Sequence, residues 1–375
     1  MATTGLQLRS EVSDQNTIQL SLEEVTFPDP GPDEVLVRVD ATPINPSDLG
    51  LLVGPADGTN AQVTGTAERP VVTMGLPEGA RKMMAARVGQ SLPVGNEGAG
   101  EVVAAGESPQ AQALLGKTVG MIGGEMYGQY RCLNLAQVIV LEEGTSAESG
   151  ASCFVNPMTA LAMVETMRRE GHSAIVHTAA ASNLGQMLNR LCISEGIRLV
   201  NIVRKPEQQS LLREQGAEIV LNSESDSFLR DLTGALADTG ATIAFDAIGG
   251  GKLVSRILSC MEAAAAQQGG AYSRYGSDTF KQVYIYGALD TGPSILNRNF
   301  GFSWAIGGWL LLPVMQILGN ETVGAMRKRV AAEIDTTFAS HYSRKITLRE
   351  VLDPDVIVAY CKKATGEKFL IEPQR

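Results

Sequence analysis

The sequence is poor in the residues that form covalent cross-links and metal sites. Its 375 residues include five cysteines and three histidines, and the cysteines lie far apart without a C-x-x-C pair. We therefore expect neither a disulfide framework nor a structural zinc site. Unpaired cysteines are typical of a reducing compartment. The cysteines are Cys132, Cys153, Cys192, Cys260 and Cys361.

Positive charge and long apolar runs are also scarce. The formal net charge of -10 disfavours nucleic acid as a partner, because nucleic-acid binding relies on a basic surface. The N-terminus lacks the basic start and apolar core of a signal peptide, and the longest apolar stretch, around Trp309–Pro313, is too short to cross a bilayer. We therefore expect a cytoplasmic protein that binds neither nucleic acid nor membrane.

What is present indicates two globular domains. The length, the 44% hydrophobic residues and the 40 glycines are typical of an α/β protein with two cores. Up to about residue 150, short β-branched runs such as Glu34–Val39 and Glu101–Ala104 predict a β-rich domain. From about Asn156, apolar strands alternate with helical stretches, which is the pattern of a parallel sheet built from βαβ units.

The predicted fold class is α/β, with a Rossmann (doubly wound parallel sheet) domain and a β-rich domain. We place the Rossmann domain at residues 155–308 and the β-rich domain at residues 1–154 and 309–375. A helix over Glu321–Phe338 and a strand over Lys368–Ile371 are predicted in the last part. The predicted parallel strands are 173–177, 198–203, 219–221, 241–245 and 282–286.

Residues 55–93 form a long stretch without clear periodicity inside the first domain. Long loops in compact domains are usually functional or disordered. A substrate lid is one interpretation of this stretch. A structural excursion or an oligomer contact is the other.

The stretch from Ile175 to Gln186 predicts a strand that turns through small residues into a helix. Small residues let backbone amides approach a pyrophosphate, and a helix N-terminus attracts anions. The strict G-x-G-x-x-G is absent, and a tight turn needs small residues in any case. On the dinucleotide interpretation, the contacting residues are Ala180, Ser182, Asn183, Leu184 and Gly185.

The end of the next predicted strand carries Arg204 and Lys205. An NAD enzyme places a carboxylate at this point, against the ribose 2′-hydroxyl. A guanidinium instead suits a 2′-phosphate, which a carboxylate would repel. We therefore predict NADP(H) as the cofactor. The alternative is a solvated basic pair at a strand end.

Five patches resemble the quinone oxidoreductase branch of the medium-chain dehydrogenase/reductase superfamily, in the right order across nearly the whole chain. Asn96, Ser182-Asn183 and Asn201–Arg204 resemble the mitochondrial-type 2-enoyl thioester reductases within that branch. The patches are Pro43–Asp48, Gly95–Gly100, Asn156–Ala160, the turn that ends at Gly185, and Ala364–Lys368.

The resemblance implies a GroES-like substrate domain and further cofactor contacts. Asn156 and Thr159 would lie near the nicotinamide, and Gly287, Ala288 and Leu289 would line the cofactor. Arg204 would hold the 2′-phosphate. The resemblance also implies a homodimer joined through the Rossmann sheet edges, near residues 300–308.

The zinc-bearing alcohol dehydrogenases of this superfamily have a Cys in the stretch occupied here by Ile44–Ser47 and a His before Glu97. Asn45 and Asn96 stand there in this chain, and Asn is a poor zinc ligand, so no zinc is predicted. Hydrogen-bond donors must then polarise the substrate, and we assign Asn45 and Ser47 as catalytic candidates, with backbone amides as the alternative donors.

In enoyl thioester reductases a Tyr donor follows the Asn-Pro-Ser-Asp stretch, but residues 49–58 contain no Tyr. Tyr127 or Tyr130 could replace it only if the fold brings one of them to the nicotinamide. We therefore expect an NADPH-dependent reductase of quinones or α,β-unsaturated carbonyl compounds, a small-molecule enzyme. The alternatives are a 2-enoyl thioester reductase and a non-catalytic NADPH-binding protein.

Overall fold

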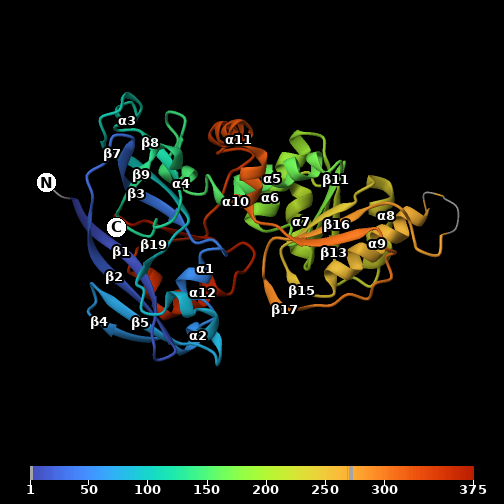
Figure 1. Ribbon diagram of the computed structural model, residues 1–375, viewed down its shortest axis with the longest axis horizontal. Coiled ribbons are helices and arrows are strands. Elements are labelled where there is room, and N and C mark those ends of the chain that lie inside the picture. Colours follow the sequence, from blue (N-terminus) through green and yellow to red (C-terminus); the bar gives the residue numbers. More distant parts are fainter. Residues whose placement is uncertain (1–2, 268, 270–272) are drawn as a thin grey trace. The chain divides into compact units, whose positions relative to one another are not determined.

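The computed structural model describes residues 3–267, 269 and 273–375, which divide into two compact units (Figure 1). The first unit contains residues 1–155 and 327–375, and the second contains residues 156–326. The second unit thus includes residues 309–326, which the sequence prediction placed with the first. The reason is local, since Trp309 donates its Nε1 proton to Thr166 and Arg169 donates to the carbonyl of Ile317.

The first unit is built on two sheets whose strands alternate buried and exposed residues. One sheet has the order β4-β5-β2-β1-β6, and the other has the order β10-β8-β7-β3-β20-β19, with β9 also paired to β3. Apart from the parallel pair of β19 and β20, these strands are antiparallel.

The strands of the first unit are β1 (Thr3–Val12), β2 (Thr17–Phe27), β3 (Glu34–Pro43), β4 (Gln62–Gly65), β5 (Pro70–Gly75), β6 (Leu92–Pro93), β7 (Glu97–Ala105), β8 (Thr118–Ile122), β9 (Tyr130–Asn134), β10 (Val138–Val140), β19 (Arg344–Ile346) and β20 (Phe369–Ile371). Its α-helices are α1 (Leu49–Leu52), α2 (Ala80–Met83), α3 (Pro109–Gln112), α4 (Ala147–Gly150) and α12 (Pro354–Cys361), and α11 (Asn320–Ala332) crosses the boundary.

The stretch 55–93 extends the first of these sheets. Within it, β5 pairs with β2, and β4 pairs with β5 as the outermost strand of the sheet. All four residues of β4 are exposed. The strand therefore has no alternation of buried and exposed residues from which the sequence could have predicted it. The structural excursion is therefore the interpretation that the backbone supports.

The second unit contains a six-stranded parallel sheet in the order β13-β12-β11-β14-β16-β18. Counted along the chain this is 3-2-1-4-5-6, the order of a Rossmann fold, so the predicted fold class is confirmed. Helices lie on both faces of the sheet (Figure 1). Leu232, Ile257 and Leu258 of α8 and α9 belong to the apolar core on one face, together with Val176 and Val200.

The sheet strands are β11 (Ala174–His177), β12 (Arg198–Val203), β13 (Ile219–Asn222), β14 (Ile243–Asp246), β16 (Lys281–Ile285) and β18 (Trp304–Gly308). The helices are α5 (Val155–Arg169), α6 (Asn183–Ser194), α7 (Pro206–Glu214), α8 (Phe228–Thr239), α9 (Leu253–Gln267) and α10 (Leu311–Leu318). Two short strands, β15 (Gly249–Gly251) and β17 (Asp290–Ser294), pair separately.

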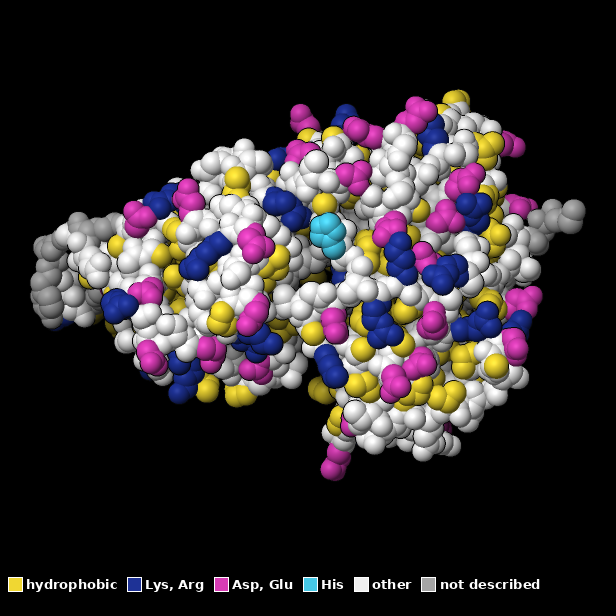
Figure 2. Space-filling model, turned by 180° about the vertical axis from the view of Figure 1, so that it is seen from behind, with side chains coloured by type: hydrophobic (Ala, Val, Ile, Leu, Met, Phe, Trp, Pro, Cys, Tyr) yellow, Lys and Arg dark blue, Asp and Glu magenta, His cyan; other side chains and the backbone are white. Residues whose placement is uncertain are grey.

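The surface agrees with the mixed charge composition. Figure 2 shows basic and acidic side chains interspersed on the face drawn there. Among the described residues, no helix is long and apolar enough to span a membrane.

Candidate functional site

The turn between β11 and α6 lies where the strand order of the parallel sheet reverses, since β11 has β12 on one side and β14 on the other. Ligands of doubly wound sheets bind at this switch point, outside the carboxyl ends of the strands. Ala179 has a positive φ of 50°, and Ser182 caps α6 by accepting the Gly185 N–H at 3.1 Å. The turn that the sequence predicts therefore leads into a capped helix N-terminus.

Gly185 is required by the close contact between α6 and this turn. A Cβ on Gly185 would lie 2.2 Å from the carbonyl oxygen of Ala180, a backbone atom that cannot rotate away. This is the close helix–strand packing for which dinucleotide folds use a glycine. Leu184 and Ala180 are buried beside it, whereas Ser182 and Asn183 are half-buried.

A buried polar network holds the same edge of the sheet, and the sequence prediction missed it. Thr178 donates its hydroxyl proton to Asp246 Oδ1 at 2.7 Å and accepts the Ala247 N–H at 2.9 Å. Asp246 Oδ2 accepts the Gly249 N–H at 2.8 Å. The available sequence signal was the acidic residue Asp246 directly after the apolar run Ile243–Phe245. A carboxylate at a strand end can accept hydrogen bonds from the loop that follows.

Arg204 and Lys205 follow the last residue of β12, the strand next to β11, and both are exposed. Their backbone N–H groups donate to Gln208 Oε1 at 3.1 and 3.2 Å, which fixes the backbone at the start of α7. The two side chains are thus basic groups at the strand end where a carboxylate would serve a 2′-hydroxyl.

Gly287, Ala288 and Leu289 follow β16 and lead into β17. Leu289 donates its N–H to Ala247 at 3.1 Å, and Asp290 donates to Ile248 at 2.8 Å, so the segments after β14 and β16 are joined. A Cβ on Gly287 would lie 2.6 Å from the Ala247 carbonyl oxygen, so this approach needs glycine.

His177 and Tyr286 form a stacked pair at the ends of β11 and β16. Their rings lie 5.7 Å apart, and His177 Nε2 is 2.7 Å from the Tyr286 hydroxyl. Burial lowers the pKa of His177 to about 3, so the imidazole is neutral. His177 is fully buried, whereas Tyr286 is half-buried.

Asn156 and Thr159 lie in the first turns of α5, where Asn156 is half-buried and Thr159 is buried. Both residues have interaction partners within the protein. Their role at a nicotinamide stays a prediction.

In the first unit, Asn45 and Ser47 differ in exposure. Asn45 is buried and donates its Nδ2 proton to Glu97 Oε1 at 2.8 Å. Ser47 is exposed, and its Oγ accepts a hydrogen bond from Asn96 Nδ2 at 3.1 Å. The Asn96 and Asn45 side chains therefore bind protein groups.

Two predicted substitutes for the missing tyrosine have different surroundings. Tyr127 is fully buried, and its hydroxyl donates to the Pro43 carbonyl at 3.0 Å. Tyr130 is half-buried and packs at 5.8 Å against Phe27. Tyr127 therefore packs in the core of the first unit, where its hydroxyl already has a protein partner.

Three charged residues that the sequence prediction did not assign lie buried near Asn45. Glu97 Oε2 accepts the N–H groups of Phe154 and Val155, each at 2.8 Å, at the start of α5. Lys368 donates to Ser152 Oγ at 2.6 Å, and Asp48 accepts two backbone N–H groups.

Burial dominates the electrostatics of this cluster. It raises the pKa of Asp48 to about 7, against the backbone hydrogen bonds, and it also raises the pKa of Glu97. It lowers the pKa of Lys368 to about 8, although Glu97 and Asp48 act in the opposite direction. A charged residue directly before an apolar strand, as Lys368 is, was the available sequence signal.

The described part of the chain contains no group of three or more His, Cys, Asp or Glu side chains that could hold a metal ion. Glu97 is bound to Asn45 and to two backbone N–H groups instead.

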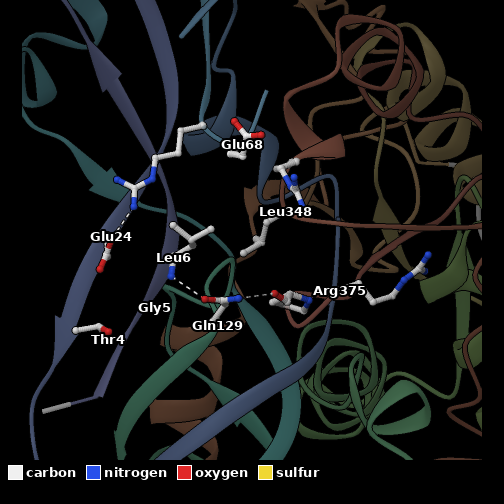
Figure 3. A pocket seen from close by; sticks show the side chains of 11 residues that line it. Thr4, Gly5, Leu6, Glu24, Glu68, Gln129, Leu348 and Arg375 are labelled. Carbon is white, nitrogen blue, oxygen red and sulfur yellow. Dashed lines mark hydrogen bonds and ion pairs between the residues drawn. The ribbon is translucent and has the colours of Figure 1, made fainter. Parts of the chain in front are cut away.

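A separate open cavity of about 430 Å³ lies within the first unit (Figure 3). Gln129 bridges it, accepting the Leu6 N–H at 2.9 Å and donating to the Pro373 carbonyl at 3.3 Å. Arg69 in its wall is paired with Glu24 at 2.5 Å. The lining residues are Thr4, Gly5, Leu6, Glu24, Glu68, Arg69, Gln129, Leu348, Arg349, Pro373 and Arg375. None of the predicted site residues is among them.

Comparisons with known proteins agree with this architecture. No family model matches the chain. It is 25% identical over 268 residues to the mitochondrial enoyl-[acyl-carrier-protein] reductase of Caenorhabditis elegans, which covers 68% of this chain and 66% of that protein. The matches to the curated relatives span between 50% and 66% of those proteins' length.

Solved structures match over nearly the whole chain, as two examples illustrate. A Mesorhizobium loti protein assigned as an NADPH:quinone reductase has a TM-score of 0.72 and 25% identity, with 100% of this chain and 99% of that chain covered. A mutant form of the Candida tropicalis enoyl thioester reductase has a TM-score of 0.67 and 17% identity, with 99% and 100% covered. The chain therefore has the Rossmann and GroES-like fold of the medium-chain dehydrogenase/reductase superfamily, and it is similar to the quinone oxidoreductases and enoyl thioester reductases of that superfamily.

Proposed function

We propose that this chain is an NADPH-dependent oxidoreductase that reduces quinones or α,β-unsaturated carbonyl compounds by hydride transfer without zinc. The observation that carries the proposal is the tight turn at the switch point of the sheet, followed at the end of β12 by the exposed Arg204. A cofactor with a 2′-phosphate matches this basic group, because guanidinium binds phosphate through paired hydrogen bonds.

The residues present fit an NADP(H) molecule. Gly185 lets α6 pack closely against the turn, the capped N-terminus of α6 suits a pyrophosphate, and Arg204 with Lys205 suits the 2′-phosphate. In the proposed arrangement Ala180, Ser182, Asn183 and Leu184 complete the turn, Asn156 and Thr159 lie near the nicotinamide, and Gly287, Ala288 and Leu289 line the cofactor. Bound there, NADPH would supply a hydride. The second unit is then the cofactor domain, and the first unit is the substrate domain.

The proposed reaction needs a hydrogen-bond donor for the substrate oxygen. Of the two candidates, Asn45 is buried and donates to Glu97, whereas Ser47 is exposed. We assign donation to substrate to Ser47 and support of the loop to Asn45. Hydrogen-bond donors of this kind stabilise negative charge without a metal ion.

A second candidate function is 2-enoyl thioester reduction. It is favoured by the curated relatives, several of which are named enoyl-[acyl-carrier-protein] reductases. The absence of Tyr from residues 49–58 stands against a tyrosine donor at that place. The substrate panel below separates the two functions.

We also propose a homodimer joined through the sheet edge at β18. This strand ends the six-stranded sheet, and Phe302 just before it is 81% exposed. Pairing of two such edges would cover the apolar side chain and the open backbone groups. Light scattering of the purified protein should give twice the 39.8 kDa chain mass.

The test of the function is NADPH oxidation by purified, metal-depleted protein with quinones, enones, enals and enoyl thioesters. We expect turnover with at least one of the first three classes, and no increase when zinc is added. Turnover with enoyl thioesters alone would establish the second candidate. Tight NADPH binding without turnover on any class would indicate a non-catalytic NADPH-binding protein and refute the proposal.

A further inference from the structure

The Asp48 carboxylate joins the two stretches that carry Ser47 and Asn96. Its Oδ2 accepts the Asn45 N–H at 2.7 Å, and its Oδ1 accepts the Asn96 N–H at 2.9 Å. Asp48 is only 2% exposed, so water does not compete for these bonds. The backbones on either side of Ser47 and at Asn96 are thus held at a fixed separation.

Within this frame, Asn96 Nδ2 donates to Ser47 Oγ at 3.1 Å. A hydroxyl has one proton and two acceptor positions, and an amide NH₂ group can only donate. The Ser47 proton therefore cannot point at Asn96 Nδ2. Since Ser47 is exposed, its O–H group is directed away from this contact and is available to a ligand.

We infer that Asn96 is a positioning residue that presents the Ser47 hydroxyl as the hydrogen-bond donor to the substrate oxygen, with Asp48 holding both residues in place. The inference rests on the proposed function and deepens it. Asn96 would act through Ser47, so it touches neither the substrate nor the cofactor in this scheme. It would also make the hydroxyl a better donor, because a hydrogen bond accepted by Oγ polarises O–H.

Bound NADPH would supply the hydride with its two electrons, which would form the new C–H bond at the β-carbon of the enone and leave NADP⁺. The C=C electron pair then forms a double bond between the α-carbon and the carbonyl carbon, and the C=O pair moves to the oxygen. This enolate oxygen accepts the hydrogen bond from Ser47. Water then protonates the α-carbon. Ser47 keeps its own proton throughout and acts only as a hydrogen-bond donor.

The hydrogen bond can be tested without any turnover by a thiol at position 47. In the Ser47→Cys variant, the thiolate would accept the Asn96 hydrogen bond, which lowers the thiol pKa. The pKa is read from the pH dependence of iodoacetamide alkylation, with wild-type protein as the blank for the five native cysteines. Asn96→Ala in this background should raise the thiol pKa by roughly one unit, since bonds to charged groups are among the stronger ones.

A matched substitution tests whether position 96 lies beside the thiol. Asn96→Asp keeps the size of the side chain but replaces the donor by a carboxylate, so charge repulsion adds to the lost hydrogen bond and the thiol pKa should rise by more than in Asn96→Ala. A purely structural role predicts that Asn96→Ala leaves the thiol pKa unchanged. Ser210→Cys, an exposed thiol on α7, is the control and should not respond to either change.

The catalytic consequence is tested on whichever substrate the panel identifies. We expect Ser47→Ala to lower kcat roughly 100-fold, and Asn96→Ala to lower it about tenfold with little change in KM. In the double variant the loss should equal that of Ser47→Ala alone, because Asn96 acts through Ser47. Multiplied losses would overturn the inference.

The two failures are distinguishable. An unchanged thiol pKa in Asn96→Ala overturns the positioning role, whatever the activity. A shifted thiol pKa in a protein without any turnover supports the positioning of position 47 and refutes the proposed function.

Discussion

The two units place their charged site residues in opposite environments. In the first unit Asp48, Glu97 and Lys368 are buried among hydrogen-bond partners. In the second unit the switch-point turn is built from small, uncharged residues, and its basic pair Arg204 and Lys205 is exposed.

The difference shows what each set of charges can do. A buried charge is costly unless it is paired and hydrogen-bonded, so removal of one member of the first set leaves others without partners. An exposed charge contributes little to folding but can bind an anion. Substitutions in the first set should therefore change stability, and those in the second should change ligand binding.

The largest effect is expected for Glu97→Ala. The change removes the Glu97 acceptor from three N–H donors, those of Asn45 Nδ2, Phe154 and Val155, and leaves Asp48 as the remaining carboxyl group that acts on Lys368. We expect a loss of about 3–5 kcal/mol in the free energy of unfolding, measured by chemical denaturation. Glu101→Ala, on the same strand but in an exposed pair with Arg38, should cost less than about 1 kcal/mol. Equal losses in the free energy of unfolding for Glu97→Ala and Glu101→Ala would contradict the claim that the buried charges stabilise the fold more than the exposed ones.

The pH dependence of stability should show the charge on Asp48. Its folded-state pKa of about 7 lies above that of an unfolded Asp, so the folded state binds the proton more tightly. Stability from this group is complete below about pH 4 and is lost as the pH rises to 7. Relative to Asp48→Asn, the wild type should lose on the order of 3–4 kcal/mol over this range.

The measurement is denaturant unfolding of both proteins between pH 4 and 8. Asp57 provides a control of opposite sign, because hydrogen bonds from Thr59 lower the pKa of this exposed carboxyl. Its contribution is lost as the pH falls. If the free energy of unfolding of the wild type changes with pH in the same way as that of Asp48→Asn, the raised pKa of the buried Asp48 is contradicted.

Gly185→Ala tests the turn of the second unit. The added Cβ would meet the Ala180 carbonyl oxygen and displace α6 from the strand. We expect a loss of about 1–3 kcal/mol in stability and weaker NADPH binding in a fluorescence titration. The control is Gly234→Ala in α8, where a Cβ meets no atom within 4 Å, so it should stabilise by about 0.5–1 kcal/mol. An unchanged affinity of Gly185→Ala for NADPH would contradict the proposal that this turn binds the cofactor.

Much of the second unit could be predicted from the sequence. Its apolar runs are local signals, so the five predicted strands lie within two residues of β11 to β14 and β16. The helix predicted over Glu321–Phe338 is shorter and ends at Ala332. The cap by Ser182 also follows from neighbours in sequence.

The first unit was less predictable because its site is assembled from distant residues. Glu97 and Asn45 are 52 positions apart, and Lys368 and Ser152 are 216 positions apart. No periodicity predicts these pairs. The difference in exposure between Asn45 and Ser47, two residues apart, likewise depends on tertiary packing.

The central claim is that Arg204 recognises a 2′-phosphate, and the affinity of Arg204→Ala for NADPH and NADH tests it most directly. Fluorescence titration should show the dissociation constant for NADPH rising at least tenfold, since a charge-assisted hydrogen bond contributes about 1.5–3 kcal/mol, while that for NADH stays the same. Arg213→Ala, which removes an exposed arginine from α7, should change neither. Equal weakening of NADPH and NADH by Arg204→Ala would contradict the account.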